Sequence, residues 1–166
     1  MSNETLRQDS GRPSDSLPPL ARLVVCERSG QWASALRREW SDEEPRLHET
    51  RHEDDAWTEL REAAGSCVIL EVRRSRLAEV VAWLQRLGRE YPAACAIVVG
   101  DADLTPTEGL LREAGAVLVH WRIRDADAIV RVARRHMAVR RPADRSWREQ
   151  FFDRLPWGEF AVATTQ

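Results

Sequence analysis

In the stretch Ser66-Cys67-Val68-Ile69-Leu70-Glu71-Val72, a continuous apolar run ends in a carboxylate. This run is the strongest of five, and a segment with helical periodicity follows each of them. The other four runs are Leu23-Val24-Val25-Cys26, a weaker one at residues 46–51, Ala96-Ile97-Val98-Val99 and Ala116-Val117-Leu118-Val119. Continuous apolar strands that alternate with amphipathic helices are typical of a parallel sheet covered on both faces. We therefore predict a doubly wound α/β fold of five strand–helix units.

The sequence divides into three parts by composition. Residues 1–20 are polar, contain three Pro and show no periodicity, so we predict a disordered N-terminal arm. Residues 21–141 contain all five units and form the predicted α/β domain. Residues 142–166 are rich in aromatic side chains, and we predict a short helix followed by an aromatic tail.

Within the α/β domain, the spacing of the large side chains predicts which of them are buried. Trp32, Trp40 and Trp57 lie at core positions of their helices, so we expect all three to pack inside. The apolar stripe of the third helix is assigned to Leu77, Val80, Val81, Leu84 and Leu87. Trp83 falls outside this stripe, so we expect it to be exposed. Thr105 and Pro106 are predicted to begin the fourth helix, with Pro at its first position.

Composition excludes several kinds of chemistry. The chain has 25 Arg and no Lys, which rules out a phosphate-loop lysine, a Schiff base and a Ser/Lys dyad. Its formal net charge of −2 gives no overall attraction to nucleic acid or membrane. Cys26, Cys67 and Cys95 fall in or beside apolar runs, so we expect buried, reduced thiols and a cytoplasmic protein. We also expect no membrane association, because no apolar stretch approaches the length of a membrane span.

Polar or small residues follow the apolar runs where function is expected. In open parallel sheets, ligands bind beyond the carboxyl ends of the strands. The residues that close the runs are Cys26, Glu27, Glu71, Gly100, Asp101 and Arg122. No glycine-rich dinucleotide turn, zinc-ligand spacing or nucleophile elbow accompanies them. We therefore expect no enzyme activity, no cofactor and no metal site.

Two short motifs connect this pattern to a known family. Residues 113–116, Glu-Ala-Gly-Ala, precede the fifth run, and residues 124–129, Arg-Asp-Ala-Asp-Ala-Ile, open the fifth helix. With the five-unit order over residues 21–141, they resemble the receiver domain of bacterial response regulators. The resemblance implies a flavodoxin-like fold and a signalling role. It also implies a site where an aspartate after the third strand accepts a phosphoryl group beside Mg²⁺.

The residues at the corresponding positions have lost this chemistry. The first acid of the family's metal site becomes Cys26 and the second is Glu27. The phosphate-accepting position is Glu71, the hydroxyl position is Gly100 and the lysine position is Arg122. Cys removes a hard oxygen ligand that Mg²⁺ prefers, and misplacing a reacting group by about 1 Å can cost about 10²-fold in rate. We therefore predict a degenerate pseudo-receiver that is not phosphorylated.

Glu71 has three possible roles in this interpretation. It can be a solvated carboxylate at the end of a strand, or it can form a salt bridge with Arg122, as Glu27 can. It can also retain some metal or phosphate chemistry, in which case the domain is a divergent receiver that is still phosphorylated.

The fifth helix is a candidate binding surface. Arg131, Arg134 and Arg135 make it basic, and the resemblance implies that receivers pair through their fourth and fifth helices. We expect a second copy or another protein on this surface. A regulator that binds nucleic acid through these arginines is the less favoured alternative, because no base-reading motif accompanies them.

The C-terminal aromatic residues provide a second candidate surface. Ser146 can cap a helix that places Trp147, Phe151 and Leu155 on one stripe, and Trp157 follows it. So many aromatic side chains need to be covered. Either they pack on their own domain, or they bind a partner as an anchor.

Overall fold

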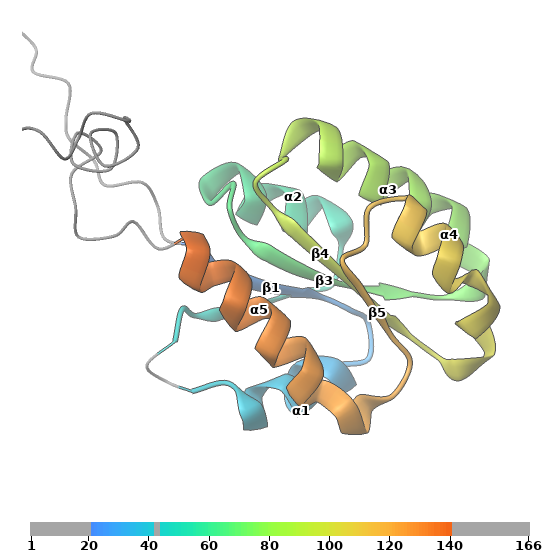
Figure 1. The fold of residues 1–166 in the computed structure, drawn as a ribbon, viewed down its shortest axis with the longest axis horizontal. Helices are drawn as coiled ribbons and strands as arrows, with labels where there is room; N and C mark the ends of the chain where they lie inside the picture. The colour runs from blue at the N-terminus through green and yellow to red at the C-terminus, as the bar shows by residue number, and fades with distance from the viewer. Residues whose placement is uncertain (1–20, 42–43, 141–166) are drawn as a thin grey trace, which may run out of the picture.

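The computed structural model describes residues 21–41 and 44–140. The predicted N-terminal arm and the C-terminal helix and tail lie outside these residues. Five parallel strands form one sheet in the order β2-β1-β3-β4-β5, which confirms the predicted flavodoxin-like doubly wound α/β architecture (Figure 1). The strands are β1 Leu23–Cys26, β2 Leu47–Thr50, β3 Cys67–Val72, β4 Cys95–Gly100 and β5 Leu118–His120.

Helices cover both faces of the sheet, as predicted. Their bounds are α1 Gln31–Glu39, α2 Glu53–Glu62, α3 Leu77–Glu90, α4 Glu108–Glu113 and α5 Ala126–Arg140. Figure 1 shows α1 and α5 on one face and α2, α3 and α4 on the other. Each face has its own apolar core, because successive residues of a fully buried strand point to opposite sides of the sheet.

The start of the fourth helix differs from the prediction. A 3₁₀ segment, Ala102–Thr107, precedes α4, and Pro106 lies inside that segment. The hydroxyl of Thr105 donates to the carbonyl of Ala102 at 2.6 Å instead of capping the helix. The tight 3₁₀ turn uses the residues that the sequence pattern assigned to the first turn of an α-helix, so α4 is short.

The predicted exposure of Trp83 is wrong. Only 5% of Trp83 is exposed, and its ring centroid lies 4.7 Å from that of Trp57, which is buried as predicted. Val80, Trp83, Leu84 and Leu87 are spaced as a helical stripe at positions i, i+3, i+4 and i+7, and all four are buried. The apolar face of α3 is therefore wider than the sequence interpretation assumed.

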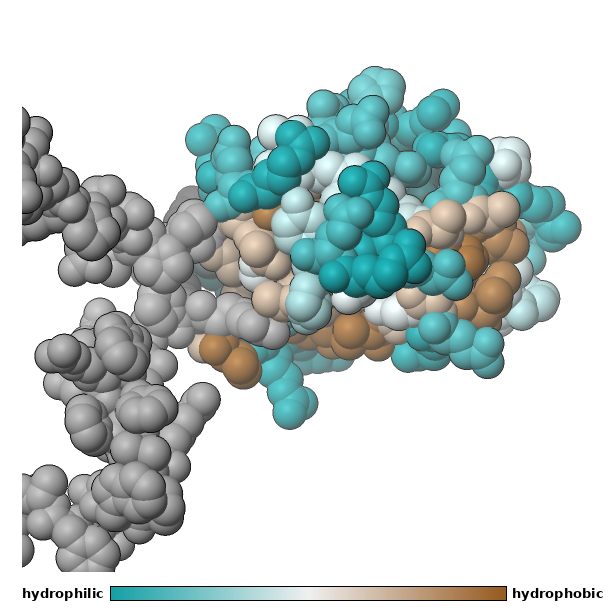
Figure 2. Space-filling view, turned by 90° about the horizontal axis from the view of Figure 1, so that it is seen from above, coloured by the Kyte–Doolittle hydropathy of each residue, from teal (hydrophilic) through white to brown (hydrophobic). Residues whose placement is uncertain are grey.

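The outer surface over α2 and α3 is mostly hydrophilic, with smaller hydrophobic areas among the charged groups (Figure 2). All three cysteines are buried, as predicted, and are free thiols. Among residues 21–41 and 44–140, no helix is long and apolar enough to cross a membrane.

Candidate functional site at the carboxyl edge of the sheet

The predicted site residues meet at one edge of the sheet. Cys26 of β1 is in register with Leu70 of β3, so the next residues, Glu27 and Glu71, leave adjacent strands at the same level. A hollow of about 650 Å³ opens at this edge. The residues that line it come from the ends of β3, β4 and β5 and from the start of α1: Ser29, Gln31, Trp32, Glu71, Gly100, Asp101, Trp121, Arg122, Ile123, Arg124 and Asp125.

Glu27 caps helix α1. Its carboxylate is buried and accepts hydrogen bonds from the backbone N–H groups of Trp32, at 3.0 Å, and Ala33, at 2.5 Å. The hydroxyl of Ser29 donates to the same carboxylate at 3.1 Å. The residue at the helix N-cap is Gly30, which has no side chain to do this, and the first turn contains no acid. A carboxylate at this position satisfies free N–H groups and interacts favourably with the helix dipole.

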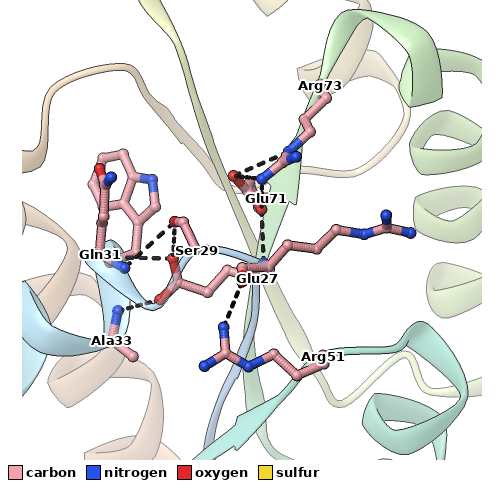
Figure 3. Close-up of polar contacts among 9 residues, drawn as sticks. Glu27, Ser29, Gln31, Ala33, Arg51, Glu71 and Arg73 are labelled. Carbon is pink, nitrogen blue, oxygen red and sulfur yellow. Dashed lines mark hydrogen bonds and ion pairs between the residues drawn. The ribbon is translucent and has the colours of Figure 1, made fainter.

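Glu71 is held by different donors. The backbone N–H of Arg28 donates to its carboxylate at 2.9 Å, and the Arg73 guanidinium forms an ion pair with it at 3.1 Å. Figure 3 shows the Glu27 side chain directed to the start of α1 and that of Glu71 directed to Arg73. The salt bridge to Arg122, one of the three roles considered for Glu71, is absent among the described residues, and Arg73 forms the ion pair instead. Glu71 is therefore not a simple solvated strand end either.

Arginines surround the position where a metal ion would be expected. Cys26 is 5% exposed, and burial raises the pKa of its thiol above the ordinary value. The Arg51 guanidinium donates to the carbonyl of Arg28 at 2.6 Å, beside the loop that connects β1 to α1 (Figure 3). Arg76 forms an ion pair with Glu53 at 2.9 Å and lines the same small space as Cys26. These cations oppose the binding of Mg²⁺, which needs several oxygen ligands.

Gly100 gives room to an aromatic ring. A Cβ at this position would lie 2.8 Å from the carbonyl of Val72 and 3.2 Å from Cζ3 of Trp121. The indole of Trp121 therefore occupies the side of β4 where the receiver family places a hydroxyl. A residue with a side chain at position 100 would have to displace the indole and the backbone of β3.

Arg122 lies at the rim of the hollow and is exposed. Within the described part of the chain it forms no ion pair, and neither does Arg124. Their cationic groups can attract an anion to the hollow. No group of three or more His, Cys, Asp or Glu among residues 21–41 and 44–140 is placed to bind a metal ion.

The predicted partner-binding arginines all lie on α5 and differ in their contacts. Arg131 bonds to Asp127 on its own helix, whereas Arg134 crosses to Glu44 and to the carbonyl of Glu39. Arg135 is exposed on α5. Trp147, Phe151 and Trp157 lie outside the described residues.

Two contributors to the site were missed by the sequence analysis. Trp121 had no recognisable signal, because its contact with Gly100 depends on the register of β4 and β5. The capping role of Glu27, in contrast, did have a recognisable signal in the sequence. The chain contains no Ser, Thr, Asp or Asn at the N-cap of α1 and no acid in its first turn, so the free N–H groups need an acceptor from elsewhere.

Known structures resemble this fold. A response regulator from Thermotoga maritima superimposes with a TM-score of 0.59 and 19% identity, over 72% of this chain and 98% of that chain. The CheY-like protein TadZ from Pseudomonas aeruginosa PAO1 gives a TM-score of 0.55 and 14% identity, over 68% of this chain and 98% of that chain. An orphan response regulator of H. pylori gives a TM-score of 0.55 and 12% identity, over 70% of this chain and 96% of that chain.

By sequence, no family model matches the chain and no curated protein is significantly similar to it. The structural likenesses show that the chain has the fold of a CheY-like receiver domain.

Proposed function

We propose that this chain is a pseudo-receiver, a non-catalytic protein-interaction module in bacterial signalling that is not phosphorylated on Glu71. The receiver-type fold supports the signalling role, and the carboxyl edge of the sheet supports the loss of chemistry. A receiver needs acids that are available to Mg²⁺ and a carboxylate that can attack a phosphodonor in line.

The geometry of Glu27 is the main support for this proposal. A carboxylate that accepts hydrogen bonds from two buried backbone N–H groups cannot turn to a metal ion without leaving those groups without acceptors. Glu71 is similarly engaged by Arg73, so its nucleophilic oxygen atoms already have donors. Both acids of the edge therefore stabilise the fold instead of binding a phosphoryl group.

Intact mass spectrometry tests the proposal. The protein is incubated with acetyl phosphate and Mg²⁺, and the Glu71→Ala variant is treated in parallel. We expect both proteins to keep their original masses. A mass increase of one phosphoryl group that is present in the wild type and absent in the variant would establish a divergent receiver that is still phosphorylated.

The surface formed by α4, β5 and α5 is the proposed partner-binding surface. The large apolar residues that are exposed in the described part of the chain are Leu110 of α4, Val117 just before β5 and Val139 of α5, with exposed fractions of 47%, 58% and 78%. The strand β5 is an edge of the sheet, and exposed apolar side chains on the elements around such an edge favour association with another protein. The resemblance to receivers makes a second copy of the chain the first candidate.

Sedimentation velocity of the wild type and of Val117→Arg tests self-association. A dimer that forms with rising concentration in the wild type and is lost in the variant supports this surface. Wild-type protein that stays monomeric at high concentration would rule out the second copy as the partner.

Nucleic-acid binding is less well supported. Of the three arginines considered for it, Arg131 and Arg134 already have carboxylate partners within the domain, which reduces the charge available for phosphates. Salt-dependent binding of DNA or RNA that is lost when Arg131, Arg134 and Arg135 are replaced by Ala would reverse this assessment.

A further inference from the structure

A groove lies beside the C-terminal end of α5, on the opposite side of the domain from α2 and α3. It consists of two adjoining hollows of about 200 and 360 Å³ that share Trp40, Glu44 and Pro45. One hollow is completed by Arg134, Met137 and Ala138 of α5, and the other by Arg37, Ser41, Arg46 and Leu47. Figure 1 shows that α5 ends next to the connection between α1 and β2. We call this surface the Trp40 groove.

The walls of the Trp40 groove are held in place by contacts within the domain. The indole N–H of Trp40 donates to the carbonyl of Pro45 at 2.8 Å. The Arg134 guanidinium lies over the Trp40 ring, 5.9 Å from its centroid, and donates to the carbonyl of Glu39 at 2.7 Å. An apolar surface that is already formed before binding favours affinity, because little ordering has to follow.

The sequence after α5 suits this groove. Pro142 disfavours helical geometry at residue 141. Farther along, Ser146 and Glu149 have the spacing of a capping box, which marks a new helix start. Trp147, Phe151 and Leu155 then follow at intervals of four, so a helix would present them on one face.

We propose that residues 146–155 form an amphipathic helix whose Trp147 and Phe151 side chains occupy the Trp40 groove of the same chain. The groove offers apolar surface from Trp40, Pro45 and Ala138, and the segment offers an apolar stripe that needs cover. This proposal is independent of whether Glu71 is phosphorylated.

The connection between groove and segment is short enough for an intrachain contact. Residues 139 and 140 still belong to α5, so the connection is counted from Arg140 to Trp147 and can span about 23 Å when extended, at roughly 3.3 Å per residue. The groove begins at Ala138 itself, so the segment needs only part of this reach. A short tether gives an effective concentration on the order of millimolar, which makes docking within the chain more favourable than docking onto a second molecule.

Limited trypsin digestion of the full-length protein tests the proposal, because Arg145, Arg148 and Arg154 are cleavage sites inside or beside the segment. Ala138→Arg places a long charged side chain in the groove, and Ala138 is exposed, so the domain tolerates the change. Ala82→Arg is the matched control, an exposed alanine on α3. We expect cleavage at these sites to be at least about tenfold faster in Ala138→Arg than in the wild type and in Ala82→Arg.

A variant on the segment side gives the second test. Trp147→Ser combined with Phe151→Ser should also speed cleavage, and adding Ala138→Arg should have no further effect, since both changes remove one contact. The indole N–H signal of Trp40 should shift in the segment variant. Equal cleavage rates in the wild type, Ala138→Arg and Ala82→Arg would overturn the proposal. Protection that disappears on dilution would also overturn it, because the occupant would then be a second chain.

Discussion

Replacing Glu27 by Ala should destabilise the protein strongly. The substitution removes the acceptor of two buried N–H groups, those of Trp32 and Ala33. Each buried donor left without an acceptor costs about 1–3 kcal/mol, and loss of a helix cap costs about 0.5–2 kcal/mol. We expect Glu27→Ala to lower the free energy of unfolding by about 2–4 kcal/mol. Glu27→Gln, which keeps one acceptor oxygen but loses the charge, should cost about 1–2 kcal/mol.

The sign of this effect distinguishes the two roles of Glu27. In a metal site without its ion, like charges repel, so neutralising one acid stabilises the protein. Urea denaturation without divalent cations measures the difference. Glu113→Ala is the control, because Glu113 is exposed at the end of α4, and its effect should lie within about 0.5 kcal/mol of zero. A Glu27→Ala variant that is as stable as the wild type, or more so, would refute the capping role.

Three further predictions concern packing and ionisation. Gly100→Ala should lower the free energy of unfolding by about 1–3 kcal/mol, since the new Cβ meets the carbonyl of Val72; an unchanged denaturation midpoint would contradict this. Trp83→Ala should cost about 3–5 kcal/mol in the same assay, whereas an exposed Trp83 would cost little. Burial opposes ionisation of Glu59, but Arg22 and His48 together outweigh it and hold the pKa of this carboxyl below its usual value. Because the pKa of Glu59 is lower in the folded than in the unfolded protein, its ionised form stabilises the fold above about pH 4.3, and this stabilisation is lost as the pH falls through the folded pKa. Arg22→Gln should therefore reduce the dependence of the free energy of unfolding on pH in this range. Parallel plots of the free energy of unfolding against pH for the variant and the wild type would exclude the effect.

The fold could be predicted because its signals are local. The apolar runs and the periodicity of the helices identify all five strands and the helices that cover the sheet, and short segments around each run carry this information. The errors occur where contacts with neighbouring elements, and not the local sequence, determine the structure. Trp83 was assigned to the surface although the Val80 and Leu87 spacing includes it, and Thr105 entered a 3₁₀ turn that the pattern does not distinguish from an α-helix.

The sequence predicted where Glu27 and Glu71 lie but not which groups they contact. The strand ends brought Glu27 and Glu71 to one edge, as the parallel order requires. Their partners depend on side-chain geometry that no spacing rule contains. Arg73, and not Arg122, forms an ion pair with Glu71, and backbone N–H groups of α1 donate to Glu27. The proposed loss of function at this edge therefore involves new structural roles for the acids and not only missing residues.

The most direct test of the central claim is a Mg²⁺ titration followed by amide NMR. The signals to follow are the backbone N–H groups of Arg28, Trp32 and Ala33, which donate to the two acids. We expect them to stay unchanged through millimolar Mg²⁺, apart from the small drift that an NaCl titration of matched ionic strength also produces. Saturable shifts of these three signals, specific to Mg²⁺, would show that Glu27 and Glu71 bind a metal ion and would contradict the account.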